Sequence, residues 1–340
     1  MPKLFLIVLL LYSVSGVSDE YIFKAGDPSL AVWLLPNVAP SPDHNPITKE
    51  KVELGKKLFF DTRLSGGQEI SCATCHSPDK GWSDNLPTGK GHENTVLKRA
   101  SPTIINTGFN DIQMWDGRSP TLEDQALGPL ESDVEMHTNM KDLLRFLKNS
   151  GYKQLFNDVF PQEGISEKTL SKAIAAFERT IVSNNSPFDL WVKGDASALT
   201  KNQINGFKLF VDSDKANCAV CHSAPNFTDN GFHNLGLASF NNKDPDLGRY
   251  NKVPIKLMKG AFKTPTIRDI TLSAPYFHDG SATTLQQVMA HYVEGGKVKT
   301  NLSPNLKPLT LTDNEISDVI AFMRSLTTPA PPLELPTFPL

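Results

Sequence analysis

Hydrophobic residues recur at helical spacing in four segments of the chain, and two of these segments resemble each other. Residues 48–60 hold Val52, Leu54, Leu58 and Phe59, and a second such segment begins at residue 199. In it, Gly206-Phe207-Lys208-Leu209-Phe210 repeats Gly55-Lys56-Lys57-Leu58-Phe59. The repeat predicts a duplicated unit that begins with a helix.

Two further segments predict the helices that close these units. Residues 166–182 present Leu170, Ile174, Phe177 and Ile181, and residues 312–326 present Ile316, Val319, Ile320, Met323 and Leu326. Ser166 and Thr312 start these segments as N-caps, and Glu315 completes a capping box with Thr312. Elsewhere Gly and Pro are dense and no segment sustains strand alternation, so the predicted fold is mainly α, with long loops and little strand.

These segments divide the chain of 340 residues into several parts. Residues 1–18 have a Lys, a short apolar run and then small residues, which is typical of a cleaved signal peptide. Residues 19–47 are expected to form an irregular arm, 48–190 the first domain, 191–328 the second domain and 329–340 a Pro-rich tail. No later apolar stretch reaches the roughly 18 residues of a membrane-spanning helix. Together with the predicted signal peptide, this leads us to expect an exported, periplasmic protein.

The charge balance argues against one class of partner. The chain carries 34 Lys and Arg against 37 Asp and Glu, which gives a net charge of −3. Proteins that bind nucleic acid gather positive charge on a basic face or stripe. This composition provides no such excess, and we expect no nucleic-acid partner.

All four cysteines lie in one motif that occurs twice. The copies are Cys72-Ala73-Thr74-Cys75-His76 and Cys218-Ala219-Val220-Cys221-His222. C-x-x-C-H is the attachment signal of c-type haem, in which two thiols bond to the porphyrin and the histidine ligates the iron. We therefore expect two covalent haems, with His76 and His222 as the proximal ligands.

The cysteine pairs permit two other interpretations. Four thiols can hold one tetrahedral zinc ion, and each C-x-x-C pair can form a redox disulfide of the thioredoxin kind. A histidine directly after both pairs, in a chain with an export signal, favours haem over either alternative. The predicted units are accordingly two haem domains of the cytochrome c type in tandem.

Several ordered motifs carry a family resemblance across about residues 48–328. Met114-Trp115-Asp116-Gly117-Arg118 lies between the haem motifs, and Phe262-Lys263-Thr264-Pro265-Thr266-Ile267-Arg268 and Ala274-Pro275-Tyr276-Phe277-His278-Asp279-Gly280 follow the second. With these motifs in this order, the chain resembles the bacterial dihaem cytochrome c peroxidase family and, within it, the MauG-like branch.

The resemblance implies that peroxide reacts at the first haem. Gln125 and Glu135, ten and twenty positions after Trp115, match the family's distal glutamine and glutamate. A carboxylate there can move a proton from one peroxide oxygen to the other. Trp115 matches an electron relay between the haems, and His92 matches a loop histidine that ligates the first iron in some resting enzymes. On the residues alone, Glu135 would be a solvated side chain in an acidic run, Trp115 a core tryptophan and His92 an exposed loop residue.

The second haem separates the branches of the family. Family peroxidases place a methionine seven residues after the position of Leu285, whereas this chain has Tyr292 there, as the MauG-like branch does. An anionic phenolate favours ferric or higher states more than a neutral thioether does. Tyr292 is the expected distal ligand and Met289 the competing one. Weaker candidates are Met258, His278 and His291.

The calcium site of the family is weakened in this chain. Family members supply one ligand from an Asn side chain that follows an Arg, but here Arg99 is followed by Ala100. Losing a side-chain oxygen lowers the affinity for a hard cation. We therefore expect two c-type haems as cofactors, and calcium to bind poorly if it binds.

The expected function is the reduction of hydrogen peroxide to water through a high-valent haem and Trp115, with electrons from a small cytochrome c or cupredoxin. The family also leads us to expect a homodimer. Two alternatives stay open: oxidation of a protein substrate, as when MauG matures a tryptophan-derived cofactor, and electron transfer without catalysis. Electron transfer without catalysis requires both irons to be six-coordinate in every redox state, and Gln125 and Glu135 argue against it.

Overall fold

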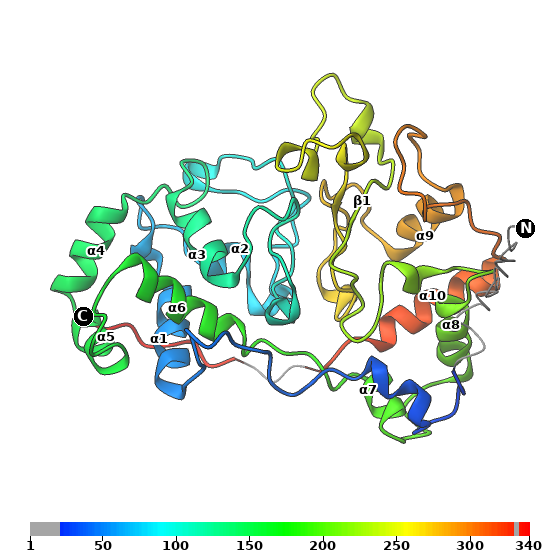
Figure 1. Ribbon diagram of the computed structural model, residues 1–340, viewed down its shortest axis with the longest axis horizontal. Coiled ribbons are helices and arrows are strands. Elements are labelled where there is room, and N and C mark those ends of the chain that lie inside the picture. Colours follow the sequence, from blue (N-terminus) through cyan, green and yellow to red (C-terminus); the bar gives the residue numbers. More distant parts are fainter. Residues whose placement is uncertain (1–20, 330–332) are drawn as a thin grey trace, which may run out of the picture.

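Two crossed helix pairs frame the two halves of the chain (Figure 1). The computed structural model describes residues 21–329 and 333–340, so the predicted signal peptide, 1–18, lies outside the described residues. In the described part the α-helices are α1 (Lys49–Phe60), α2 (Cys72–Cys75), α3 (Leu122–Glu131), α4 (Met140–Asn149), α5 (Tyr152–Val159), α6 (Glu167–Glu178), α7 (Pro187–Val192), α8 (Lys201–Val211), α9 (Leu285–Glu294) and α10 (Asp313–Ser325). Strands β1 (Phe232–His233) and β2 (Phe262–Lys263) form an antiparallel pair. The prediction of a mainly α fold with long loops is confirmed.

The helices that the hydrophobic pattern predicts are present, and side-chain caps begin them. The Thr48 hydroxyl accepts a hydrogen bond from the Lys51 NH at the start of α1, and Thr200 caps α8. Thr312 and Glu315 form the predicted capping box of α10. Each cap satisfies an NH group that the first helical turn leaves without a partner.

The helix predicted over residues 166–182 ends earlier than expected. Ser166 caps α6 as predicted, but the helix stops at Glu178. Beyond that point the Ile181 carbonyl accepts a 2.9 Å hydrogen bond from the Asn106 NH of a distant loop. Because the Ile181 carbonyl is bonded to this loop, it does not accept a further intrahelical hydrogen bond. The hydrophobic pattern therefore extends beyond the last helical residue.

Each helix crossing depends on a glycine, and a separate core surrounds each crossing. A Cβ added at Gly55 of α1 would collide with the Ala173 carbonyl of α6, and one at Gly206 of α8 would collide with the Asp318 carbonyl of α10. Around the first crossing, the core includes Leu54, Leu58, Phe59, Leu170, Ile174 and Phe177. Around the second, it includes Phe188, Phe207, Phe210, Val319, Phe322 and Met323.

The loops of the two halves repeat the same backbone turns. Trp82 (φ 59°) in the first half corresponds to Phe227 (φ 53°) in the second, and Met114 (φ 72°) corresponds to Phe277 (φ 70°). Positive φ is a strained conformation for bulky side chains. Its recurrence at matching places shows that the duplication extends from the helices into the loops.

The amino-terminal arm packs first on the second half of the chain (Figure 1). Trp33 lies in the second core, where its ring meets Phe207 edge-on at 5.4 Å between centroids. The Trp33 carbonyl accepts a 2.8 Å hydrogen bond from Arg268, which is itself fully buried in a 2.9 Å ion pair with Asp189 of α7. The arm then crosses to α1 of the first half.

The carboxyl-terminal tail crosses in the opposite direction. Its described part, residues 333–340, lies on the first half, where the Leu340 carbonyl accepts a 2.6 Å hydrogen bond from the Gly151 NH. The Thr337 carbonyl accepts a second bond of 2.6 Å from the Lys57 ammonium. Each half of the molecule therefore carries a segment from the far end of the chain.

We expect Gly55→Ala to destabilise the holoprotein by about 1–3 kcal/mol, because the new methyl group pushes α1 away from the Ala173 carbonyl. Gly128→Ala in α3 is the matched control, since a Cβ there meets no atom closer than 4.0 Å. Alanine favours a helix over glycine by up to about 1 kcal/mol, so the control should be neutral or stabilising. Denaturant unfolding measures both, and equal stability of the two variants would contradict the crossing argument.

Candidate haem-binding site

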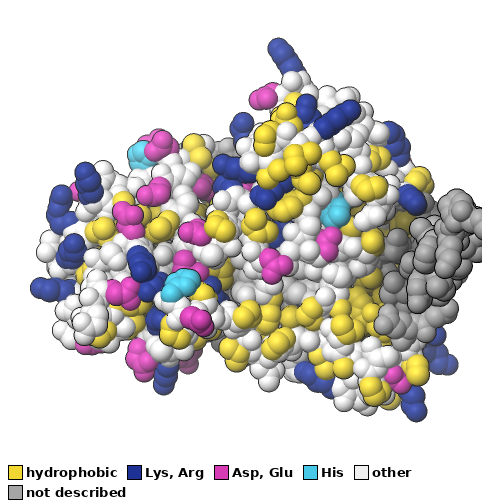
Figure 2. All heavy atoms as spheres, in the orientation of Figure 1, with side chains coloured by type: hydrophobic (Ala, Val, Ile, Leu, Met, Phe, Trp, Pro, Cys, Tyr) yellow, Lys and Arg dark blue, Asp and Glu magenta, His cyan; other side chains and the backbone are white. Residues whose placement is uncertain are grey.

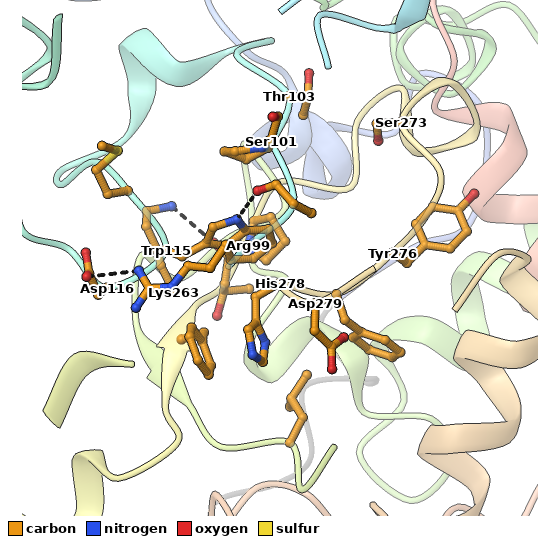
Figure 3. Close-up of a pocket in the computed structure, with 18 of the residues that line it drawn as sticks. Arg99, Ser101, Thr103, Trp115, Asp116, Lys263, Ser273, Tyr276, His278 and Asp279 are labelled. Carbon is orange, nitrogen blue, oxygen red and sulfur yellow. Dashed lines mark hydrogen bonds and ion pairs between the residues drawn. The ribbon is translucent and has the colours of Figure 1, made fainter. Parts of the chain in front are cut away.

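One large cavity lies between the two halves and receives residues from both. Its volume is about 1270 Å³, above the roughly 300–1,000 Å³ of ordinary small-molecule pockets. Both C-x-x-C-H motifs line it, and apolar side chains make up most of its wall. Figure 3 shows part of this wall, with Trp115 and Arg99 from the first half beside Lys263 and His278 from the second.

The first motif forms a single helical turn, α2, that presents its side chains to the cavity. Ser71 and Thr74 form a capping box at its start. The His76 Nδ1 lies 3.2 Å from the Trp82 carbonyl oxygen, which directs the other ring nitrogen, Nε2, away from this carbonyl. Burial lowers the pKa of His76, so the imidazole is neutral, as a metal ligand must be.

The second motif repeats this arrangement. The His222 Nδ1 lies 3.0 Å from the Phe227 carbonyl oxygen, and burial lowers the pKa of His222 as well. In both halves the accepting carbonyl belongs to an aromatic residue with positive φ, so the strained turn serves to aim it. The two histidines are therefore oriented by the same device.

The alternatives of zinc and disulfides find no support in the described residues. All four cysteines are free. Within the described part of the chain, one group of potential metal ligands comes together, Cys221 with Asp229 and His233, and it includes a single cysteine. The four sulfur atoms thus do not converge on one point. Burial raises the pKa of Cys75 to about 11 and that of Cys218 to about 12, so these thiols are not poised for disulfide exchange.

Gln125 and Glu135 both line the cavity, and Glu135 lies near enough to Cys75 of the first motif to help raise the pKa of its thiol. Gln125 lies on α3, and Glu135 lies in the turn that follows this helix. Two backbone hydrogen bonds hold the turn: the Glu135 carbonyl accepts from the His92 NH at 2.8 Å, and the Met136 NH donates to the Pro129 carbonyl at 3.0 Å. The sequence expectation that these two side chains share a site agrees with their placement.

Trp115 joins the two halves. Its indole NH donates a 2.9 Å hydrogen bond to the Ala100 carbonyl, and its own carbonyl accepts a 2.8 Å bond from the Lys263 NH. Its ring centroid lies 6.4 Å from that of His278 (Figure 3). The indole is thus fixed in the wall of the cavity that both C-x-x-C-H motifs line.

Beside Trp115, a partly buried ion-pair network spans the two halves. Arg99 pairs with Asp116 of the first half at 2.9 Å and with Asp246 of the second at 2.6 Å. Burial alone would raise the pKa of Asp116, but Arg99 and Arg118 hold it below its usual value. Ala100 offers no side-chain oxygen, and its NH and carbonyl are already bonded to His278 and Trp115. Poor calcium binding stays a prediction.

Comparisons with known proteins agree on one family. The sequence profile of the di-haem cytochrome c peroxidases matches residues 49–197, and that of cytochrome c matches residues 204–327. The chain is 43% identical to methylamine utilization protein MauG of Methylophilus methylotrophus, over 89% of this chain and 90% of that protein. It is 34% identical to cytochrome c551 peroxidase of Nitrosomonas europaea, over 86% of this chain and 85% of the relative.

The chain belongs to the dihaem cytochrome c peroxidase family. A solved structure agrees: a MauG-like protein associated with microbial copper homeostasis superposes with a TM-score of 0.80 at 31% identity, over 87% of this chain and 95% of that one. The predicted resemblance and the tandem cytochrome c-like fold are confirmed.

The residues present fit the two c-type haems that this family implies. Four free thiols and two neutral imidazoles face one apolar cavity, which is the donor set that covalent haem attachment requires. Cys72, Cys75 and His76 would hold the first haem, and Cys218, Cys221 and His222 the second.

Tyr292 is the residue that the family resemblance suggests as the distal ligand of the second haem. It lies on α9 and lines the cavity close to Cys218 and Cys221, and burial raises the pKa of its phenol. Met289, one turn earlier, also lines the cavity but is 3% exposed and packs into the second core. The geometry thus favours Tyr292 over Met289, and its ligation of iron stays a prediction.

The remaining candidates occupy different places. His278 lines the cavity, with its ring stacked on Phe262 at 3.5 Å between centroids. His291 points elsewhere, since its Nε2 lies 2.8 Å from the Leu235 carbonyl oxygen, and neither His291 nor Met258 lines the cavity. The Nε2 of His291 thus has a carbonyl partner, whereas ligation of iron by His278 stays a prediction.

His92 also lies outside the cavity lining. Its ring stacks on His137 at 4.6 Å between centroids, and its Nδ1 lies 3.3 Å from a carboxylate oxygen of Glu69. Ligation of the first iron by His92 would require this loop to move, and it stays a prediction.

Two buried charged residues in the cavity wall escaped the sequence analysis. Glu178 of α6 has one carboxylate oxygen without a hydrogen-bond partner, and burial raises its pKa to about 8. Burial lowers the pKa of Lys263 to about 8, and within the described part of the chain its ammonium donates one hydrogen bond, to the Thr264 carbonyl. The sequence signal for Glu178 was its place on the apolar face of a predicted helix.

Replacing Cys72 and Cys75 by Ala should leave one haem per chain where the native protein has two. The thioether bonds of one haem are lost, while the second motif keeps its own thiols and histidine. Pyridine haemochrome absorbance and the mass of the intact protein measure the haem content. The matched variant Cys218→Ala/Cys221→Ala should lose the other haem, and two haems in either variant would contradict the assignment.

Proposed function

We propose that this protein reduces hydrogen peroxide to water at the first haem and draws the two electrons through the second haem from a small redox protein. The observation that carries the proposal is that Gln125, Glu135 and Trp115 line one cavity together with both C-x-x-C-H motifs. The family relation to cytochrome c peroxidases supports it.

Glu135 has the chemistry that cleavage of the peroxide bond needs. A carboxylate can accept the proton of one peroxide oxygen and return it to the other, so that water becomes the leaving group. Gln125 cannot titrate, and its amide offers hydrogen bonds that orient the peroxide. When bound, the haems supply the iron that accepts peroxide and the redox centres that exchange electrons.

Trp115 serves in this proposal as the path between the two sites. Its indole is fixed by the bond to the Ala100 carbonyl, and its backbone is fixed to Lys263 of the second half. A rigid aromatic ring in the wall between two redox centres shortens the gap that an electron crosses. The indole proton stays bonded to the carbonyl, so Trp115 is assigned no role in proton transfer.

One observation favours a second candidate function, oxidation of a protein substrate. Tyr292 stands in the second half where a peroxidase would have a methionine, and a phenolate ligand stabilises oxidised iron. Such a site would retain an oxidising equivalent and pass it to a protein. The 43% identity to methylamine utilization protein MauG supports this candidate.

We also infer that the protein works in the periplasm. Attachment of c-type haem takes place outside the bacterial cytoplasm, and residues 1–18 have the composition of a signal peptide. Among the described helices, none is long and apolar enough to cross a membrane.

Glu135→Gln should lower the rate of peroxide reduction by about 10²- to 10⁴-fold while two haems remain bound, because the amide cannot accept a proton. Steady-state peroxide consumption with a small-molecule reductant measures this. Glu131→Gln is the matched control, since Glu131 is an exposed residue at the end of α3 and should tolerate the change. An unchanged rate in Glu135→Gln would refute the assigned role.

Tyr292→Met should raise the reduction potential of the second haem by roughly 100 mV or more, within the span of about 0.8 V that axial ligands cover. A thioether stabilises ferrous iron where a phenolate stabilises ferric iron. Spectroelectrochemical titration measures the potential. Met289→Leu is the control, because a core methionine should leave the potential unchanged; a shift in this variant alone would make Met289 the ligand.

A further inference from the structure

Two aliphatic side chains stand out on the surface of the second half. Ile255 and Leu257 are 57% and 54% exposed, on a loop built around the 3-10 turn Lys256–Met258. Figure 2 shows hydrophobic and Lys or Arg side chains together over the region where Figure 1 places residues 240–260. Adjacent exposed aliphatic residues on a charged surface are a feature of protein-binding sites.

The charges around this pair are mostly positive, with the exposed Asp244 beside Lys243 as a negative one. The second domain, residues 191–328, carries 15 Lys and Arg against 12 Asp and Glu, whereas residues 48–190 carry 17 against 20. The exposed lysines of the loop and of the segment before it are Lys243, Lys252, Lys256 and Lys259. Among the described residues, none of these four forms an ion pair with a carboxylate. Their charge is available to a partner.

A second loop continues this surface. The Asn301 amide donates a 2.9 Å hydrogen bond to the Lys259 carbonyl, so the loop around residues 297–307 lies against the first one. It contributes the exposed residues Lys297, Lys299 and Lys307. We call the exposed side chains of residues 252–259 the basic face, with Ile255 and Leu257 at its centre.

The other side of the same loop lines the cavity that the two haem motifs share. Leu247, Asn251, Lys252 and Gly260 line the cavity that holds Cys218, Cys221 and His222. Arg249 anchors the loop through hydrogen bonds of 2.9 and 2.6 Å to the carbonyls of Asp116 and Gly117. A protein seated on the basic face is therefore separated from the shared haem cavity by this loop.

We infer that the basic face docks an acidic electron-transfer protein, which delivers electrons to the second haem. This inference rests on the proposed function and adds the docking surface and the charge of the partner. The lysines pair with the partner's carboxylates, and Ile255 and Leu257 exclude water at the centre. Two reduced partner molecules each lose one electron for every peroxide, which takes up two protons and leaves as two water molecules.

The test compares an acidic donor, reduced plastocyanin, with a basic one, reduced mitochondrial cytochrome c, on the holoprotein. At low ionic strength, kcat/KM should be at least tenfold higher with the acidic donor, and salt should weaken this preference. In Lys256→Glu/Lys259→Glu, which changes two exposed lysines outside the cavity lining, the preference should reverse. The matched control Lys148→Glu/Lys153→Glu changes two exposed lysines of the first half and should keep the native preference.

A small-molecule reductant separates this inference from the proposed function. Peroxide reduction with that reductant should be equal in the native protein and both variants, which shows that the haem sites are intact. If the native protein shows no such activity, the proposed function fails, and plastocyanin binding to the native protein and the variants, measured by NMR line broadening, still tests the basic face. Equal kcat/KM for the acidic donor in all three proteins, or self-association through the face in place of donor binding, would overturn the inference.

Discussion

The interface between the two halves is the constraint on which the site depends. Gln125 lies on α3, whereas Glu135 and the second C-x-x-C-H motif lie in turns that no extended sheet supports, and all of them line one cavity. The Lys263 NH bonds to the Trp115 carbonyl, and Arg99 pairs with acids of both halves. A buried ion pair costs desolvation and contributes little net stability, but it strongly disfavours arrangements that break it. The interface thus favours one relative position of the two haem-binding sites.

Duplication gave the two halves one frame, and substitutions at equivalent positions gave them different chemistry. Thr121 and Thr284 cap α3 and α9, so positions can be matched along these helices. Gln125 of the first half then corresponds to an aliphatic valine in the second, and Tyr292 of the second corresponds to Pro129 of the first. In the first half, the amide of Gln125 stands at the position proposed for peroxide binding. In the second half, the phenol of Tyr292 stands at the position proposed for the distal iron ligand.

Much of this architecture could be predicted from the sequence, because strong signals mark it. The apolar periodicity of α1, α6, α8 and α10 and the two haem motifs are local patterns. The strained turns at Trp82 and Phe227 could not be predicted, since bulky residues rarely adopt positive φ without tertiary support. Nor could the buried positions of Glu178 and Lys263, because charged side chains are ordinarily expected at the surface.

The crossing of the arm and the tail has a consequence for the order of folding. Trp33 is synthesised long before α7, α8 and α10, which supply most of the second core into which it packs, and residues 333–340 are synthesised last yet lie on the first half. Contacts between such distant segments cannot form until the whole chain is available. Neither half can reach its final packing on its own. A truncation at either end therefore disturbs the packing of the half that lies farther away along the chain.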